Sequence, residues 1–248
     1  MQLQELLARA ERLRAKTPTR KRADWYDFKT EGTDTAEVYI YDEIGYFGTN
    51  SRDFVRDLAE LDGRDLTVHL NSPGGEVFEG LAIYNALRKR KGNCSVAVDS
   101  LAASIASVIA MAGTDVQIAP AGMLMIHDAW GVCVGNEQDM IETGELLGKA
   151  SDIISGVYQA RGGGTREDWR ARMRTETWYA ADEAVKAGLA DSVASYDGDA
   201  DEKAKAKAAA SFDLSVFNYA GRSKAPPPSV GLTLDPAEFS TLLKEAFK

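Results

Sequence analysis

Residues 65–98 read DLTVHLNSPGGEVFEGLAIYNALRKRKGNCSVAV, and this stretch decides the fold class. Its first part, Asp65–Leu70, has the alternation of a buried strand, and the turn-forming sequence NSPGG ends it. Residues 78–91 then repeat apolar side chains at helical spacing, and residues 94–98 are again strand-like. A strand, a helix and a strand in this order predict a right-handed crossover between two parallel strands.

Segments with the same two periodicities lie on both sides of this unit. Three more are strand-like: Ala36–Tyr41, Val116–Ala119 and Met123–Ile126. Five more are helix-like: Ser51–Leu61, Ser104–Ala112, Asn136–Gln159, Arg166–Met173 and Ala181–Ala187. The triple glycine at 162–164 is expected to end the longest of these helices. Strands that alternate with helices predict an α/β fold with a mainly parallel sheet.

The two ends of the chain differ in character from its centre. We expect residues 1–35 to form an amphipathic helix and a basic extension, and residues 36–195 to form one domain. Residues 196–230 are low in complexity and contain the run APPPS, which is typical of a linker. Residues 231–248 predict a short helix whose apolar stripe either binds a partner or packs on its own domain.

Composition narrows the functional class. The 248 residues carry 29 Lys and Arg against 38 Asp and Glu, a formal charge of −9, whereas a nucleic-acid backbone requires clustered cations. Two cysteines, Cys94 and Cys133, are too few for a disulfide-stapled secreted domain, and no apolar run reaches the about 20 residues of a membrane span. We therefore expect a soluble cytoplasmic protein that binds neither nucleic acid nor membrane, and we predict no metal or cofactor site.

The chain has only two histidines that could act as a base at neutral pH. His69 lies in the middle of a strand, which favours a structural role, whereas His127 follows an apolar strand at a point where loops display catalytic groups. Ser104 lies between a predicted strand and a predicted helix, where its hydroxyl would face the helix N-terminus. Local features alone also fit a serine chosen for tight helix packing, so both interpretations stay open at this point.

Four motifs occur in a characteristic order: NSPGG (71–75), AAS (102–104), MIHD (125–128) and EAVKAGLADS (183–192). In this order and spacing, over about residues 36–195, the chain resembles the ClpP-like serine peptidases, the proteolytic subunits of the Clp protease, and in particular their phage and prophage head maturation branch. The resemblance implies a ClpP/crotonase-like spiral of repeated β-β-α units, with a handle helix at residues 136–159. It also implies a homo-oligomeric ring, a heptamer or stacked heptamers.

The resemblance assigns roles to five positions. Ser104 would be the nucleophile and His127 the general base. The backbone amides of Gly75 and Ile105 would form the oxyanion hole, with Gly74 supporting the turn that brings them together. The strand at residues 65–70 would line the substrate groove and pair with an extended peptide.

The third catalytic position departs from the family pattern. Counting back from the GL pair at 188–189 places Glu176 where the family has an aspartate. Asp128 and Asp182 are the alternatives, and a dyad completed by backbone or water is another. Ser100 also replaces a glycine usual in the family, which is expected to tighten the approach to the nucleophile.

The leading functional hypothesis is a serine endopeptidase that works either without ATP or with a partner. By resemblance it would be a phage head maturation protease that cleaves scaffold and capsid proteins in the host cytoplasm, inside the prohead. The alternatives are a housekeeping-like Clp proteolytic subunit that works with an unfoldase and a non-catalytic ClpP-like ring or scaffold subunit. A crotonase-type enzyme acting on acyl-coenzyme A thioesters, which needs the oxyanion amides but no Ser–His pair, is the most distant alternative.

Overall fold

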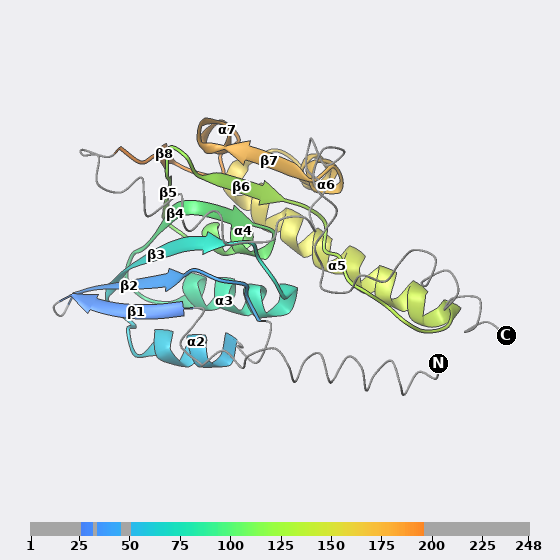
Figure 1. Cartoon of the computed structure of the whole chain (residues 1–248), viewed down its shortest axis with the longest axis horizontal. Helices are drawn as coiled ribbons and strands as arrows, with labels where there is room; N and C mark the ends of the chain where they lie inside the picture. Colours follow the sequence, from blue (N-terminus) through green and yellow to red (C-terminus); the bar gives the residue numbers. More distant parts are fainter. Residues whose placement is uncertain (1–25, 32–33, 46–50, 196–248) are drawn as a thin grey trace, which may run out of the picture. The chain divides into compact units, whose positions relative to one another are not determined.

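A computed structural model describes residues 26–31, 34–45 and 51–195 (Figure 1). The strands are β1 Tyr26–Glu31, β2 Thr35–Ile40, β3 Asp65–Ser72, β4 Cys94–Ala103, β5 Asp115–Ile118, β6 Met123–Ile126, β7 Thr177–Ala180 and β8 Ser192–Val193. The helices are α2 Ser51–Ala59, α3 Val77–Lys89, α4 Ile105–Ala110, α5 Glu137–Gly162, α6 Arg166–Arg174 and α7 Ala181–Lys186. The predicted amino-terminal helix, linker (196–230) and terminal helix (231–248) lie outside the described residues.

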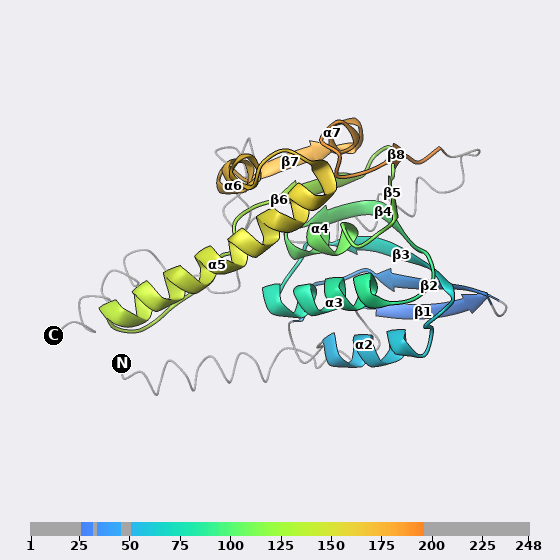
Figure 2. The same cartoon turned by 180° about the vertical axis from the view of Figure 1, so that it is seen from behind.

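The strands form one mixed sheet in the order β1-β2-β3-β4-β5-β8, with β6 branching from β4 and pairing with β7. The pairs from β2 to β5, together with β4–β6 and β5–β8, are parallel, whereas β1–β2 and β6–β7 are antiparallel. The prediction of a mainly parallel α/β sheet is confirmed. Figure 2 shows α2, α3 and α4 in a row on one face of the sheet, where the crossover connections place them.

Strand β4 is longer than its apolar pattern predicted because it pairs with two different neighbours. Residues 95–98 pair with β5, and residues 101–103 pair with β6. Ser100 lies between these two ladders, at the point where the chain leaves one partner and joins the next. The sheet therefore branches at this point, toward β5 on one ladder and toward β6 on the other.

Strands β1, β7 and β8 are absent from the sequence-based prediction. β1 lies within the 1–35 segment, and the aromatic rings of Tyr26 and Phe28 pack against Phe54 of α2, with centroids 5.3 and 5.4 Å from the Phe54 ring. β7 has only four residues and pairs antiparallel to β6. Each of the three strands has one neighbour, and β7 and β8 have only four and two residues, so their own sequence signal is weak.

The core lies between the sheet and its helices. Val38, Val68, Val96 and Val116 occupy the same register on four adjacent parallel strands, and each is buried. This row of β-branched side chains is what the apolar residues of the central strands predicted. The glycine run ends α5 as expected, since Gly163 follows the helix with φ 72°. Within the described ranges, no helix has the length and apolar character needed to cross a membrane.

Candidate active site

The ends of three parallel strands bring the predicted site residues to one edge of the sheet. β3 leads into the turn at 73–75, β4 runs into Ser104, and β6 runs into His127. Strand register fixes the neighbours, because Ala103 pairs with Met125 and the N–H of Ser104 donates to the Met125 carbonyl at 3.0 Å. Segments from three parts of the sequence therefore meet at the carboxyl edge, the usual location of sites in such sheets.

Ser104 and His127 are in hydrogen-bond contact. The imidazole Nε2 of His127 lies 2.7 Å from the hydroxyl Oγ of Ser104, although 23 residues separate them in the chain. Ser104 occupies the position before α4, a helix made of six buried residues. Among those residues, Ile105 lies against α3 at Gly80, where a Cβ would come within 2.2 Å of the Ile105 side chain. Close helix packing therefore holds the segment that follows the serine.

Backbone strain marks two of the three predicted catalytic positions. Ser104 has φ 54° and ψ −128°, and Glu176 has φ 49°. Within the described residues, these are the only non-glycine residues with positive φ. Such conformations cost of order 1–3 kcal/mol each and persist where the surrounding structure imposes them, typically at functional sites.

The imidazole of His127 is largely enclosed, and burial lowers the pKa of His127 below its ordinary value of 6.5. The nearby carboxylate of Glu176 opposes this effect and raises the pKa. Glu176 precedes β7 and His127 follows β6, so the antiparallel register that pairs Ile126 with Thr177 places the two residues opposite each other. The Glu176 Oε1 also accepts a hydrogen bond from the Trp178 indole at 3.1 Å.

The two alternative carboxylates have other surroundings. Asp128 forms an ion pair with Arg170 at 2.7 Å, and burial raises the pKa of Asp128. Asp182 is exposed in the first turn of α7. Among Asp128, Asp182 and Glu176, only Glu176 acts on the pKa of His127.

Two glycines allow the turn after β3 to approach the serine. A Cβ on Gly74 would lie 2.7 Å from the Ser104 Cβ and 3.2 Å from the Ile105 nitrogen. A Cβ on Gly75 would lie 2.1 Å from the carbonyl oxygen of Ile44. The backbone of Ile44 holds the turn through two hydrogen bonds. Its carbonyl accepts from the Glu76 N–H at 2.9 Å, and its N–H donates to the Gly74 carbonyl at 2.7 Å. The predicted oxyanion residues Gly75 and Ile105 thus lie on two segments packed against each other.

A hydrogen-bond chain behind the serine was not predicted from the sequence. The Ser107 hydroxyl donates to the Ser104 carbonyl at 2.5 Å and, with its proton committed there, accepts from the Tyr158 hydroxyl at 2.7 Å. Tyr158 is buried on α5, 51 residues from Ser107, and burial raises the pKa of its phenol. Ser107 lies three residues after Ser104, a spacing at which a hydroxyl can bond to the preceding turn of a helix, so the first bond has a local sequence signal. No local signal identifies Tyr158 as the second partner.

His69 lies apart from this pair. Its Nδ1 lies 2.9 Å from the carboxylate of Asp99, and its ring stacks on Tyr39 with centroids 4.5 Å apart. This arrangement agrees with the structural role expected from its position within a strand. Nowhere in the described ranges do three or more His, Cys, Asp or Glu side chains gather as a metal site would require.

The prediction that residues 65–70 pair with a substrate peptide is wrong. β3 is hydrogen-bonded to β2 on one side and to β4 on the other over residues 66–70. A strand with both edges occupied has no backbone groups left for a third partner. The sequence pattern could not show this, because buried strands look alike whether their neighbours are protein or substrate.

A serine hydroxyl and an imidazole in contact at the carboxyl edge of a parallel sheet are typical of α/β enzymes of acyl transfer. The family model described as Clp protease matches residues 20–197. An "ATP-dependent Clp protease proteolytic subunit" of Bacteroides fragilis is 28% identical over 165 residues, covering 62% of this chain and 80% of the relative. A protein of the same description from Porphyromonas gingivalis is 28% identical over 166 residues, 62% and 74% of the two chains. The chain belongs to the Clp protease family, a family of peptidases.

Proposed function

We propose that the protein is a serine endopeptidase in which Ser104 is the nucleophile, His127 the general base and Glu176 the residue that orients the imidazole. The observation that carries the proposal is the 2.7 Å contact between His127 Nε2 and Ser104 Oγ. Nucleophile and base within hydrogen-bond reach, with a third group acting on the base, is the arrangement that serine hydrolysis requires. A tight packing role for Ser104 alone would not require the histidine.

In the first half-reaction, Ser104 Oγ attacks the carbonyl carbon of the scissile peptide bond while His127 Nε2 takes the hydroxyl proton. The carbonyl oxygen becomes an oxyanion, which accepts hydrogen bonds from the backbone N–H groups of Gly75 and Ile105. His127 returns the proton to the leaving amine as the C–N bond breaks, which leaves an acyl-enzyme. Water then attacks the ester with His127 again as base, and the carboxylic acid and the Ser104 hydroxyl are released.

The surroundings of the imidazole suit this proton transfer. Because burial lowers the pKa of His127, the ring is neutral and able to accept a proton at neutral pH. The Glu176 carboxylate stabilises the imidazolium that forms when the proton arrives. The fixed, strained backbone of Ser104 reduces the motion needed to reach the transition state.

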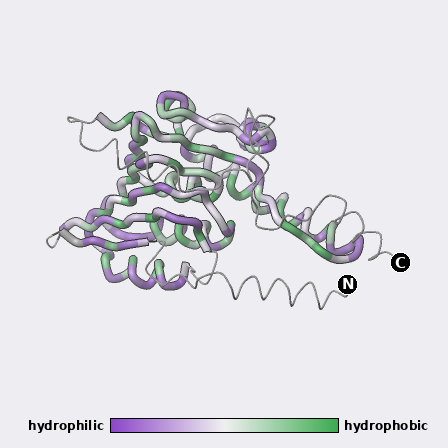
Figure 3. Tube along the Cα trace, in the orientation of Figure 1, coloured by the Kyte–Doolittle hydropathy of each residue, from purple (hydrophilic) through white to green (hydrophobic). Residues whose placement is uncertain are grey.

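Assembly into a ring of identical subunits is part of the proposal. Large apolar side chains lie exposed in the segment before α5 and on its first turns: Trp130, Val132, Val134, Met140 and Ile141. Val132 and Val134 are 84% and 81% exposed. Figure 3 shows this hydrophobic segment beside the outer part of α5. An apolar stripe of this kind is typical of a surface that binds another protein, and a second copy of the chain is the partner that the family favours.

The proposal predicts that a fluorophosphonate probe will label the full chain at Ser104. The probe reacts only with a serine whose hydroxyl is activated by a base. Peptide mapping by mass spectrometry should find the adduct on Ser104 and not on the nearby Ser107, and unfolding in urea should abolish labelling. Absence of an adduct on the folded protein would contradict the proposal and favour the non-catalytic ring subunit.

The comparisons favour the role of a Clp-type proteolytic subunit over that of a head maturation protease, because both relatives carry the former description. A Clp-type subunit depends on an ATP-driven unfoldase for folded substrates. We therefore expect the chain to cleave short peptides and unfolded casein alone, and to leave folded substrates intact until an unfoldase and ATP are added. Efficient cleavage of co-expressed capsid or scaffold proteins without ATP would instead support the phage role.

A further inference from the structure

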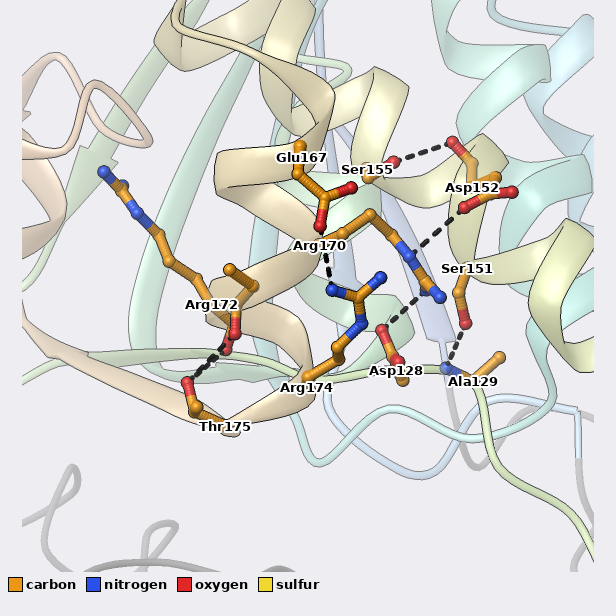
Figure 4. A network of polar contacts seen from close by, with 11 residues as sticks. Asp128, Ala129, Ser151, Asp152, Ser155, Glu167, Arg170, Arg172, Arg174 and Thr175 are labelled. Atoms are coloured by element: carbon orange, nitrogen blue, oxygen red, sulfur yellow. Dashed lines mark hydrogen bonds and ion pairs between the residues drawn. The ribbon is translucent and has the colours of Figure 1, made fainter.

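Arg170 of α6 joins two carboxylates from different parts of the fold (Figure 4). Its Nη1 donates to Asp128 Oδ1 at 2.7 Å, and its Nε forms an ion pair with Asp152 Oδ1 of α5 at 3.2 Å. The Arg170 side chain is 14% exposed, against 32% for Asp128 and 66% for Asp152. The enclosed contact with Asp128 is therefore the stronger of the two, because solvent screens the pair with Asp152.

Asp128 is the residue directly after His127, and the backbone there is bound from two sides. The Asp128 N–H donates to the Met173 carbonyl of α6 at 3.2 Å. The Ala129 N–H donates to the hydroxyl of Ser151, a buried residue of α5, at 2.9 Å. The loop after His127 is thus fixed by α5 and α6 together, and Arg170 ties the same two helices through its side chain.

The Met173 carbonyl connects this loop to the third site residue. It accepts the N–H of Glu176 at 3.0 Å in addition to that of Asp128. One carbonyl at the end of α6 therefore holds the neighbour of His127 and the backbone of Glu176. A shift of α6 relative to the loop would change the positions of both residues against Ser104.

The positive charge of Arg170 is needed to keep the Asp128 carboxylate in its partly buried position. Burial raises the pKa of Asp128, the negative charge of Asp152 raises it further, and Arg170 and Arg174 lower it. Without Arg170, a partly buried carboxylate would lose its hydrogen-bonded cation while a second carboxylate remains close by. Such a group is driven toward water, and the loop that carries it would move as well.

We propose that Arg170 is a positioning residue that, by holding Asp128, keeps the His127 imidazole within reach of the Ser104 hydroxyl. The inference rests on the proposed function, since it concerns the alignment of the proposed base and nucleophile. Arg170 does not touch the reacting atoms. Its effect passes through the loop at 128–129, which connects the catalytic edge to α5 and α6.

The test compares Arg170→Met, Arg170→Lys and Asp128→Ala with Arg174→Met as a matched control on the full chain. Arg174 lies on the same helix and lowers the pKa of Asp128 through its charge, but its ion pair joins it to Glu167, and both side chains are largely exposed. It therefore controls for the loss of a nearby cation as distinct from the loss of the direct contact with Asp128. The readouts are the second-order rate of fluorophosphonate labelling and the kcat and KM for a short peptide. Melting temperatures of all variants are measured in parallel.

We expect Arg170→Met to lower the labelling rate and kcat roughly tenfold with KM unchanged, because misplacing a base by a fraction of an ångström acts on the chemical step. Asp128→Ala should have a similar effect, and a double variant that carries both Arg170→Met and Asp128→Ala should be no worse than either single one. Arg170→Lys should react faster than Arg170→Met but more slowly than the wild type. Lysine keeps the positive charge, but its single ammonium group cannot reproduce the contacts of the guanidinium with both Asp128 and Asp152. Arg174→Met removes a cation that acts on Asp128 through its charge, so it should retain most of the wild-type rate, well above that of Arg170→Met.

The outcomes separate the inference from the proposed function. If the wild type is not labelled, the proposed function fails. If the wild type is labelled and Arg170→Met, Arg170→Lys and Asp128→Ala all react at its rate, the positioning role is overturned. If Arg170→Met does not fold, Arg170→Lys and Asp128→Ala still decide: a loss of kcat without a change in KM supports the role, and an unchanged kcat excludes it.

Discussion

Replacing Ser104 by alanine will lower kcat for peptide hydrolysis by about 10⁴-fold or more and abolish fluorophosphonate labelling. The hydroxyl that contacts His127 at 2.7 Å is the only atom removed, and no other nucleophile takes its place in the proposed reaction. Because alanine occupies less space in a helix end that is already closely packed, the fold should persist. Circular dichroism and kinetics on a short peptide measure the two effects separately.

Glycine at the same position should separate catalysis from stability. Ser104 has φ 54°, a conformation that glycine adopts without strain and that any residue with a Cβ resists. We therefore expect Ser104→Gly to be as inactive as Ser104→Ala yet more stable than it, by about 1 kcal/mol in the free energy of unfolding. Urea unfolding of the two variants at one protein concentration gives the difference. Equal stability, or a more stable alanine variant, would show that the backbone at 104 stores no strain.

The close packing around Ser104 explains its unfavourable backbone conformation. The turn at 73–75 reaches Ser104 only because Gly74 has no side chain, and α4 begins immediately after the serine. The hydroxyl is thereby placed at the junction of three closely packed segments and in contact with the imidazole. Loss of stability at a functional position is the common cost of such preorganisation.

The sequence predicted the parts of the fold that depend on local periodicity. The central strands carry an apolar residue at every second position, so Val68 and Val96 read as buried and prove to lie in register. Strands β1 and β7 were not predictable in this way, because each has a single neighbour and draws its stability from packing. Periodicity likewise does not identify the strand that pairs with another, which is why β3 was wrongly predicted to pair with a substrate peptide.

At the active site, too, local sequence features could be predicted and tertiary contacts could not. Ser104 and His127 were noted as candidates because each lies where an apolar strand ends, a property of the local sequence, and the resemblance to the family then assigned their roles. Arg170 and Tyr158 could not be identified in this way, because they act through partners 42 and 51 residues away and belong to helices whose other residues are ordinary. Supporting residues of this kind are chosen by tertiary contacts, so only a structure reveals them.

Glu176 was assigned by resemblance, from its spacing to the downstream GL pair, and its effect on the pKa of His127 makes the assignment testable by removing the charge. Glu176→Gln should lower kcat by roughly 10²–10⁴-fold, because a neutral amide neither stabilises the imidazolium nor fixes the tautomer that accepts the Ser104 proton. Glutamine has nearly the same shape and keeps an oxygen for the Trp178 indole, so the fold should be retained. Glu176→Asp, which keeps the charge on a shorter side chain, should lose less activity.

The pH dependence of kcat/KM provides the sharper criterion. Its acid limb reports the pKa of His127 in the free enzyme, since only the neutral imidazole acts as a base. Burial lowers this pKa below 6.5 and the Glu176 carboxylate raises it in part, so removing the charge must lower it further. The acid limb of Glu176→Gln should therefore move to lower pH while its plateau falls, whereas Asp182→Asn, on the exposed turn of α7, should change neither. A Glu176→Gln enzyme with the wild-type limb and plateau would mean that the imidazole is oriented by the backbone or by water instead.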